Sequence, residues 1–156
     1  MDEKAWMALA LAEAEAALAE GEVPVGAVLV RDGEVIARAH NRREQDADPT
    51  AHAELLALRE GARRLGDWRL GGCTLYVTLE PCPMCAGALL MSRADRCVFG
   101  AFDRQRGCCG SVYDLPGDPA LQGRTRWQAG VMAEESRALL DAFFARHRPD
   151  ANDPES

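Results

Sequence analysis

One histidine, one glutamate and two cysteines have the spacing of a catalytic zinc site. His52 and Glu54 are separated by one residue, and Cys82 and Cys85 follow in the segment Pro81-Cys82-Pro83-Met84-Cys85. His52, Cys82 and Cys85 would supply three ligands, which leaves the fourth tetrahedral position of zinc open for water. Zinc lowers the pKa of such a water to about 7, and the Glu54 carboxylate can carry its proton without coordinating the metal. The sequence therefore predicts one catalytic Zn²⁺ per chain.

Two simpler explanations of the cysteine pair fit the sequence less well. A Cys-x-x-Cys redox motif would need no histidine partner, and a structural zinc site would need a fourth ligand at suitable spacing. The other two histidines, His40 and His147, are isolated in the sequence. A structural site would also have no use for a carboxylate beside the metal, so Glu54 favours a catalytic site.

Two helices are expected to present these residues from their N-terminal ends. One helix is predicted over residues 51–65, with Thr50 as its cap, so that His52 and Glu54 lie in its first turn. A second helix is predicted over residues 82–92 and places both cysteines at its start. The partial positive charge of a helix N-terminus stabilises a thiolate and developing negative charge. Both effects suit a metal site that must deprotonate two cysteines and a water.

The rest of the chain predicts alternating helices and strands. Asp32-Gly33, between two β-rich runs, is a hairpin turn signal. The order α-β-β-α-β-α-β-β-α indicates an α/β domain in which helices cover both faces of a central sheet. The remaining expected elements are helices at residues 3–20 and 133–148 and strands at residues 23–30, 34–39, 73–79, 96–101 and 127–132.

Length and composition predict one cytoplasmic domain. A chain of 156 residues has the size of a single domain with a substantial core. No apolar run approaches the roughly 20 residues that span a bilayer, and the acidic start Met1-Asp2-Glu3-Lys4 does not resemble a secretory signal. We therefore expect no membrane association, a single zinc-dependent domain over residues 1–148 and a disordered acidic tail over residues 149–156.

The six cysteines indicate metal or redox chemistry rather than a disulfide framework, because we expect a cytoplasmic protein. Only the Cys-x-x-Cys pair has ligand spacing. Cys73 and Cys97 lie in expected strands, and we interpret them as buried, inert thiols. The vicinal pair Cys108-Cys109 lies in a glycine-flanked loop and receives no functional interpretation from the sequence.

Charge is distributed unevenly along the chain. The formal net charge of −7 argues against a nonspecific nucleic-acid binder. Residues 93–148, however, contain nine arginines and seven acidic residues. A guanidinium group suits phosphate binding and stacking on bases, although the preference for arginine over lysine also fits a bias in genomic base composition.

Longer motifs narrow the class of zinc protein. His-x-Glu followed by Pro-Cys-x-x-Cys is typical of zinc-dependent nucleobase deaminases in general. The run Thr-Leu-Glu-Pro-Cys-x-Met-Cys-Ala-Gly and Asp103 after Phe-Gly-Ala are more specific. Through them the chain resembles the bacterial tRNA-specific adenosine deaminases of the cytidine deaminase-like superfamily, over nearly its whole length. The segments that carry the resemblance are residues 22–28, 41–42, 48–54, 74–82, 84–88 and 98–101.

This resemblance implies a fold, a reaction and two partners. The fold would be the cytidine deaminase-like three-layer α/β/α arrangement with a central five-stranded mixed sheet, in a homodimer. The reaction would be hydrolytic deamination of the wobble adenosine of an arginine tRNA to inosine, with the anticodon stem-loop bound to the protein. His52, Cys82 and Cys85 would hold zinc, and Glu54 would be the catalytic proton shuttle.

The resemblance also implies roles for residues that contact the substrate. Asn41 would hydrogen-bond the purine, Val25 and Leu79 would wall the base pocket, and Asp103 would contact the substrate strand. Three of these positions also have a simpler explanation, because Val25 and Leu79 could belong to the core and Asn41 could form a turn.

The C-terminal helix resembles the aromatic and basic helix that embraces the anticodon loop in this family. It contains Phe143-Phe144, followed by Arg146 and Arg148. As an alternative, the two arginines could form a solvated helix face or favourable C-terminal charges.

Departures from the family pattern leave other functions open. Phe102 stands where the family has a polar or basic residue, and residues 113–126 match poorly. These loops touch RNA in the family, so the substrate is less well supported than the chemistry. A deaminase of a free nucleobase or nucleoside, such as guanine or cytosine, would share every zinc residue, and the basic C-terminal helix argues against it. A zinc-stabilised RNA-binding module without catalysis is the third hypothesis, and Glu54 argues against that one.

Overall fold

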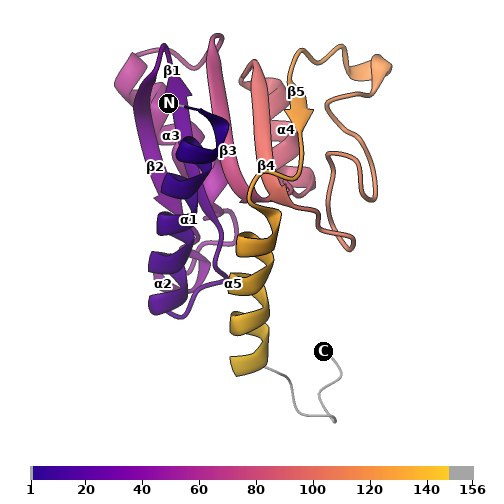
Figure 1. The fold of residues 1–156 in the computed structure, drawn as a ribbon. Coiled ribbons are helices and arrows are strands. Elements are labelled where there is room, and N and C mark those ends of the chain that lie inside the picture. The colour runs from indigo at the N-terminus through magenta and orange to yellow at the C-terminus, as the bar shows by residue number, and fades with distance from the viewer. Residues whose placement is uncertain (1, 148–156) are drawn as a thin grey trace.

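A five-stranded mixed sheet forms the centre of the computed structural model, which describes residues 2–147 (Figure 1). Its strands are β1 (Gly26–Arg31), β2 (Glu34–His40), β3 (Cys73–Leu79), β4 (Arg96–Ala101) and β5 (Arg126–Gln128). They lie in the order β2-β1-β3-β4-β5. β1 is antiparallel to β2 and β3, whereas β4 is parallel to β3 and β5. The expected five-stranded mixed sheet is thereby confirmed.

Helices cover both faces of this sheet and complete three layers (Figure 1). The helices are α1 (Glu3–Ala19), α2 (Arg43–Asp46), α3 (Ala53–Leu65), α4 (Pro83–Met91) and α5 (Ala133–Arg146), with a 3₁₀ turn η1 at Pro119–Leu121. α1 and α5 pack on one face, and α3 and α4 pack on the other. No helix within residues 2–147 has the length and apolar character needed to cross a membrane.

The central strand β3 shows why the sequence folds in this way. Leu75 and Val77 pack towards α3 and α4, whereas Tyr76 packs against α1, and none of the three is more than 4% exposed. Because successive strand residues point to opposite faces, a strand covered on both sides must be apolar at nearly every position. The apolar run of residues 73–79 therefore identified a central strand correctly.

The start of α3 differs from the expected one. This helix begins at Ala53, two residues later than predicted, and Thr50 is not its cap. The Thr50 hydroxyl and N–H donate instead to the Asp48 carboxylate, at 2.7 and 2.8 Å. Thr50 thus belongs to a turn around Pro49, which ends before the helix starts. The Asp32-Gly33 hairpin turn is confirmed, with φ of 52° and 74° at its two residues.

Two further differences concern the end of β5 and a helix that was not predicted. β5 stops at Gln128 rather than at residue 132, because Gly130 and Met132 have positive φ and turn the chain into α5. The short helix α2 was not predicted; its Glu44 and Gln45 N–H groups donate to the buried carboxylate of Glu22, at 3.1 and 2.8 Å. The predicted tail over residues 149–156 lies outside the described residues.

Candidate metal centre and active site

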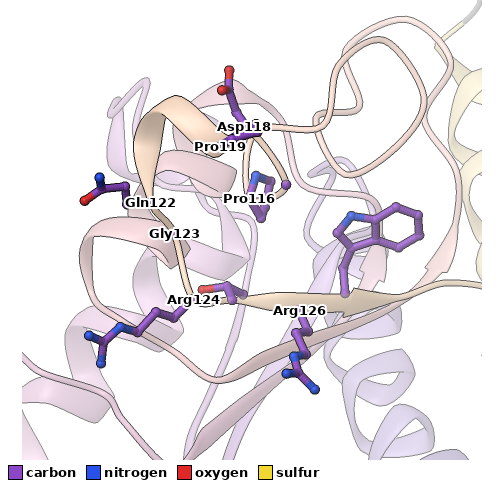
Figure 2. A pocket seen from close by; sticks show the side chains of 10 residues that line it. Pro116, Asp118, Pro119, Gln122, Gly123, Arg124 and Arg126 are labelled. Atoms are coloured by element: carbon purple, nitrogen blue, oxygen red, sulfur yellow. The ribbon is translucent and has the colours of Figure 1, made fainter.

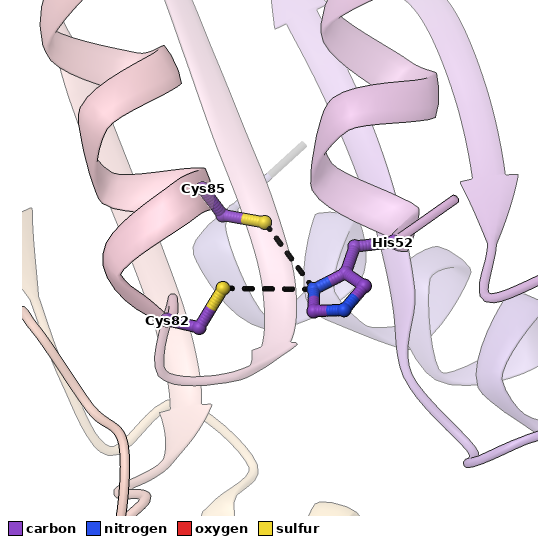
Figure 3. Close-up of side chains that lie close together, drawn as sticks. All are labelled: His52, Cys82 and Cys85. Carbon is purple, nitrogen blue, oxygen red and sulfur yellow. Dashed lines mark hydrogen bonds between the residues drawn. The ribbon is translucent and has the colours of Figure 1, made fainter. Parts of the chain in front are cut away.

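The three expected metal ligands converge where α3 and α4 begin (Figure 3). The Nδ1 atom of His52 lies 3.6 Å from Sγ of Cys82 and 3.5 Å from Sγ of Cys85. A nitrogen and a sulfur ligand of tetrahedral zinc, with ordinary bond lengths, are about 3.5 Å apart. All three ligand atoms lie within 4.8 Å of one another. These residues fit Zn²⁺, and the predicted metal site is confirmed.

Helix starts position all three ligands. His52 and Cys82 are the N-cap residues of α3 and α4, with extended backbone angles, and Pro83 occupies the first turn of α4. The fixed φ of proline suits this position. Cys85 follows in the same turn, so both sulfur atoms face His52 (Figure 3). His52 therefore lies one residue before the first turn of its helix, not within that turn as predicted.

The two ligand thiols, Cys82 and Cys85, have pKa values shifted in opposite directions. A hydrogen bond from the Cys85 thiol lowers the pKa of Cys82 to about 4, and the same contact together with burial raises the pKa of Cys85. The bond to Cys82 raises the pKa of His52. A thiolate is thus already favoured at Cys82, at the positive ends of two helices, which prepares the site for a cation.

Glu54 is placed as the proton shuttle requires. It lies in the first turn of α3, and its side chain is only 4% exposed. Burial raises the pKa of Glu54 to about 7. A carboxyl group with a pKa near neutrality can accept and return a proton with similar ease. Glu54 lies within hydrogen-bonding reach of Cys85, so it stands directly beside the metal ligands.

Asn41 supports the same helix start from outside it. The residue follows β2, is 7% exposed, and its Oδ1 accepts the Ala53 N–H at 2.8 Å. Asn41 therefore provides the helix cap that was predicted for Thr50. Its amide NH₂ forms no hydrogen bond to another residue within residues 2–147, so two donors remain for a ligand.

The apolar residues expected around the base lie at the same edge of the sheet. Val25 directly precedes β1 and is 5% exposed, and Leu79 is the half-buried last residue of β3. Both belong to the apolar layer between the sheet and α3 and α4. Their placement fits the wall of a base pocket and fits a core position equally well.

Glu80 holds the loop after β4, a role that the sequence analysis missed. Its side chain is 2% exposed, and its carboxylate accepts N–H groups from Asp103 at 2.9 Å and from Cys109 and Ser111 at 3.0 Å each. The Ser111 hydroxyl donates to it as well. A Cβ atom on Gly107 would collide with the same carboxylate. An acidic residue at the end of an apolar strand was the available signal.

Asp103, expected to contact the substrate strand, is half-buried at the start of this loop. Its Oδ1 accepts the N–H groups of Gln105 and Arg106, at 3.1 and 3.2 Å. The loop begins beside the metal ligands, because the Glu80 N–H donates to Ala101 at 2.9 Å and Cys82 follows two residues after Glu80.

The C-terminal end of α5 lies across a hollow from Asn41. The hollow has a volume of about 530 Å³, and its walls include Asn41, Arg43, Phe143, Phe144 and His147. The His147 ring stacks on Phe143 with centroids 4.1 Å apart. Phe144 is 55% exposed and meets Phe143 edge to face. Aromatic rings thus line a path that leads to one of the expected substrate contacts.

The two arginines expected at this helix end are only partly described. Arg146 is the last residue of α5 and is exposed. Arg148 lies outside the described residues. Within the described residues, the cluster of metal ligands includes neither His40 nor His147. His40 bridges the carboxylates of Glu13 and Glu20, at 2.7 and 3.0 Å.

A second hollow, of about 650 Å³, lies between the loop after Leu115 and the start of β5. Figure 2 shows Asp118 and Pro119 on one side of the chain and Arg124 and Arg126 extending to the other. None of the expected metal, catalytic or substrate-binding residues lines this hollow. It is therefore not part of the candidate active site.

The remaining cysteines are free thiols without ligand geometry. Cys73 and Cys97 are fully buried, and burial raises the pKa of both, as expected of inert thiols. Burial also raises the pKa of Cys108 and Cys109, so both favour the protonated form and are poor nucleophiles.

The part of the chain that contains the metal ligands matches a known family. The family model for the cytidine and deoxycytidylate deaminase zinc-binding region matches residues 1–101. The tRNA-specific adenosine deaminase of Bacillus subtilis is 50% identical over 143 residues, which cover 92% of this chain and 89% of that protein.

Solved structures extend the similarity to the fold. A structure from work on A-to-I editing by tRNA:A34 deaminases at the wobble position of transfer RNA has a TM-score of 0.86 and 43% identity, and the match covers 88% of this chain and all of that one. The guanine deaminase of Nitrosomonas europaea has a TM-score of 0.81 at 25% identity, over 92% of this chain and 85% of that one.

Proposed function

The chain belongs to the tRNA-specific adenosine deaminases within the cytidine and deoxycytidylate deaminase family, and on this premise we propose that it converts the wobble adenosine of a tRNA anticodon loop to inosine. An arginine tRNA is the substrate that we expect. The observation that carries the proposal is the convergence of His52, Cys82 and Cys85 next to the buried carboxyl group of Glu54.

The reaction is a hydrolysis in which adenosine and water give inosine and ammonia. His52, Cys82 and Cys85 would hold zinc, which when bound would lower the pKa of a coordinated water to about 7 and make it a nucleophile towards C6. Glu54 transfers one proton of the attacking water to N1 of the base, and then transfers the second proton, from the hydroxyl group formed at C6, to the amine that leaves as ammonia.

The Cys82 N–H is the proposed donor to the oxygen that becomes attached to C6. It forms no hydrogen bond to another residue within the described part of the chain, although it lies at a helix start. A fixed backbone donor at this point stabilises the charge that develops in the transition state.

Three residues would hold the base. The free amide donors of Asn41 suit an acceptor nitrogen of a purine, and Val25 and Leu79 would cover its faces. An anticodon-loop base is well suited to such a pocket, because it is already partly unpaired and costs little to flip out.

The end of α5 would bind the rest of the anticodon loop. The hollow between Asn41 and α5 offers aromatic rings for stacking, and Arg146 and Arg148 would contact phosphates. Asp103 would contact the strand on the other side of the base.

A homodimer in the cytoplasm is the proposed working unit, with residues 1–148 as its single domain. The apolar surface of α4 supports the dimer, since Met91 is 71% exposed and Leu90 is half-buried. The neighbouring Leu89 is fully buried and belongs to the core.

Deamination of a free base such as guanine is the second candidate function, and the similarity to a guanine deaminase favours it. To decide, the purified zinc-loaded protein is incubated with a panel of transcribed tRNAs and with free adenine, guanine, cytosine and their nucleosides, and inosine and ammonia are measured. Inosine at the wobble position of an arginine tRNA is the expected result. Ammonia from a free base, with every tRNA unchanged, would overturn the proposal.

A further inference from the structure

An exposed aromatic ring lies where the sheet meets the candidate active site. Phe102 directly follows β4, and 41% of its surface is exposed. The ring meets the buried Phe99 ring edge to face, with centroids 5.3 Å apart and planes at 80°. Its backbone carbonyl accepts a hydrogen bond from Arg137 of α5 at 2.6 Å. Phe102 is therefore fixed by its contacts with Phe99 and Arg137, while part of its ring faces solvent.

The residues after Phe102 form an ordered turn. The Asp103 N–H donates to the buried Glu80 at 2.9 Å, and the Asp103 carboxylate accepts two further N–H groups of the turn. The Gly107 N–H closes the turn on the Asp103 carbonyl at 2.8 Å. This hydrogen bonding fixes the backbone before any ligand binds, which lowers the entropy cost of binding.

Two positive charges lie on the same turn. Arg104 and Arg106 are exposed. Neither forms an ion pair with another of the described residues. An aromatic ring interleaved with unpaired arginines is the usual surface for single-stranded nucleic acid, because the rings stack on bases and the cations follow the phosphates.

We propose that the strand-binding loop, residues 102–106, grips the substrate RNA beside the reacting nucleotide: the Phe102 ring stacks on a neighbouring base, and Arg104 and Arg106 bind phosphates of the same strand. The inference rests on the proposed RNA substrate and adds to it a specific contact. Phe102 acts as a positioning residue, since the loop begins beside the metal ligands but holds none of them.

The test compares anticodon stem-loops that contain an abasic nucleotide on the 5′ or the 3′ side of the target adenosine. Phe102→Leu keeps an apolar contact with Phe99 but removes the stacking surface, and Phe102→Trp keeps that surface. On the intact stem-loop, Phe102→Leu should raise KM about tenfold or more with little change in kcat, and Phe102→Trp should restore KM. On the stem-loop that lacks the stacked base, Phe102→Leu and the unchanged protein should have equal KM.

Trp68→Leu is the matched control. Trp68 is 53% exposed and lies beside two arginines, Arg69 and Arg93, whose guanidinium carbons are 4.7 and 5.2 Å from its ring centroid. It precedes β3, whereas Cys82 and Cys85 follow the opposite end of that strand, so Trp68→Leu should leave KM unchanged.

The arginines have a separate readout. Arg104→Ala with Arg106→Ala should reduce the slope of log KM against log salt concentration by about 1.4, the value for two phosphate contacts to a single strand.

An unchanged KM of Phe102→Leu, or the same increase on the intact and both abasic stem-loops, would overturn the stacking contact. Melting temperatures of both Phe102 variants are measured alongside. A loss of stability in Phe102→Leu without the base-dependent KM effect would assign Phe102 to the fold alone. Either result leaves the proposed function standing, provided that the unchanged protein forms inosine in the intact stem-loop.

Discussion

The metal centre and the strand-binding loop lie side by side but are held in different ways. His52, Cys82, Cys85 and Glu54 contact one another and shift one another's pKa. Phe102, Arg104 and Arg106 make separate contacts with solvent and share only the backbone of their turn. Groups in one network act as a unit, whereas distant, independent contacts have additive effects. Substitutions at the metal centre should therefore be all-or-none, and those on the surface should be graded.

The largest effect is expected for Cys85→Ser. This change removes a thiolate ligand from a three-ligand site, so metal analysis should find strongly reduced zinc, and inosine formation should fall to the background. Cys73→Ala is the control, because it removes a buried thiol that lies outside the site and should retain about one zinc per chain. Full zinc occupancy in Cys85→Ser would remove Cys85 from the ligand set.

Glu54→Gln should lower kcat about 1,000-fold while zinc content and RNA affinity stay the same, because the amide cannot carry the proton. Single-turnover inosine formation and a binding titration measure the two effects. Near-normal turnover of Glu54→Gln would contradict the role of Glu54 as the proton carrier.

Glu80→Gln tests the junction between the two regions. Both carboxylate oxygens of Glu80 accept N–H hydrogen bonds. In Glu80→Gln one of these oxygens is replaced by an NH₂ group, which in either orientation of the amide faces another N–H. Leaving such buried donors unsatisfied costs about 1–3 kcal/mol, and urea denaturation should show an unfolding free energy lower by about that amount. KM for the stem-loop should rise while zinc content stays constant. Unchanged stability would show that the carboxylate charge is not required for the turn.

The smallest effect is expected at the end of α5. Arg146→Ala with Arg148→Ala should weaken tRNA binding and flatten its salt dependence by about two phosphate contacts, in an effect that adds to that of Phe102→Leu. Arg63→Ala with Arg64→Ala is the matched control, since these arginines end α3 and pair with Glu60. An unchanged salt slope, together with a lower melting temperature, would assign the two C-terminal arginines to the helix alone.

The sequence predicted the metal centre well because the information for it is local. The His52, Cys82 and Cys85 ligands each stand at a helix start that a few neighbouring residues specify. The apolar run of β3 and the Asp32-Gly33 turn are local signals too. Thr50 was misassigned because such a hydroxyl can either accept a helix N–H or donate to a nearby carboxylate, and here it donates to Asp48 in the turn.

Roles that depend on distant partners were not predicted. Asn41 caps α3 across 12 residues, and Glu80 bonds N–H groups up to 31 residues away. The sequence marked Phe102 only as a departure, and its exposure on an ordered turn became evident from the fold.

The attachment of the loop through Glu80 allows the side chains of that segment to vary while its backbone stays in place. Residues 103–111 are joined to the scaffold by hydrogen bonds from their own backbone N–H groups and the Ser111 hydroxyl to one carboxylate, and backbone donors are present whatever most side chains are. The side chains at Arg104, Gln105 and Arg106 can accordingly be exchanged without loss of the anchor, as long as Gly107 is kept free of a Cβ. A library randomised at these three positions would thus vary substrate preference on an unaltered catalytic framework.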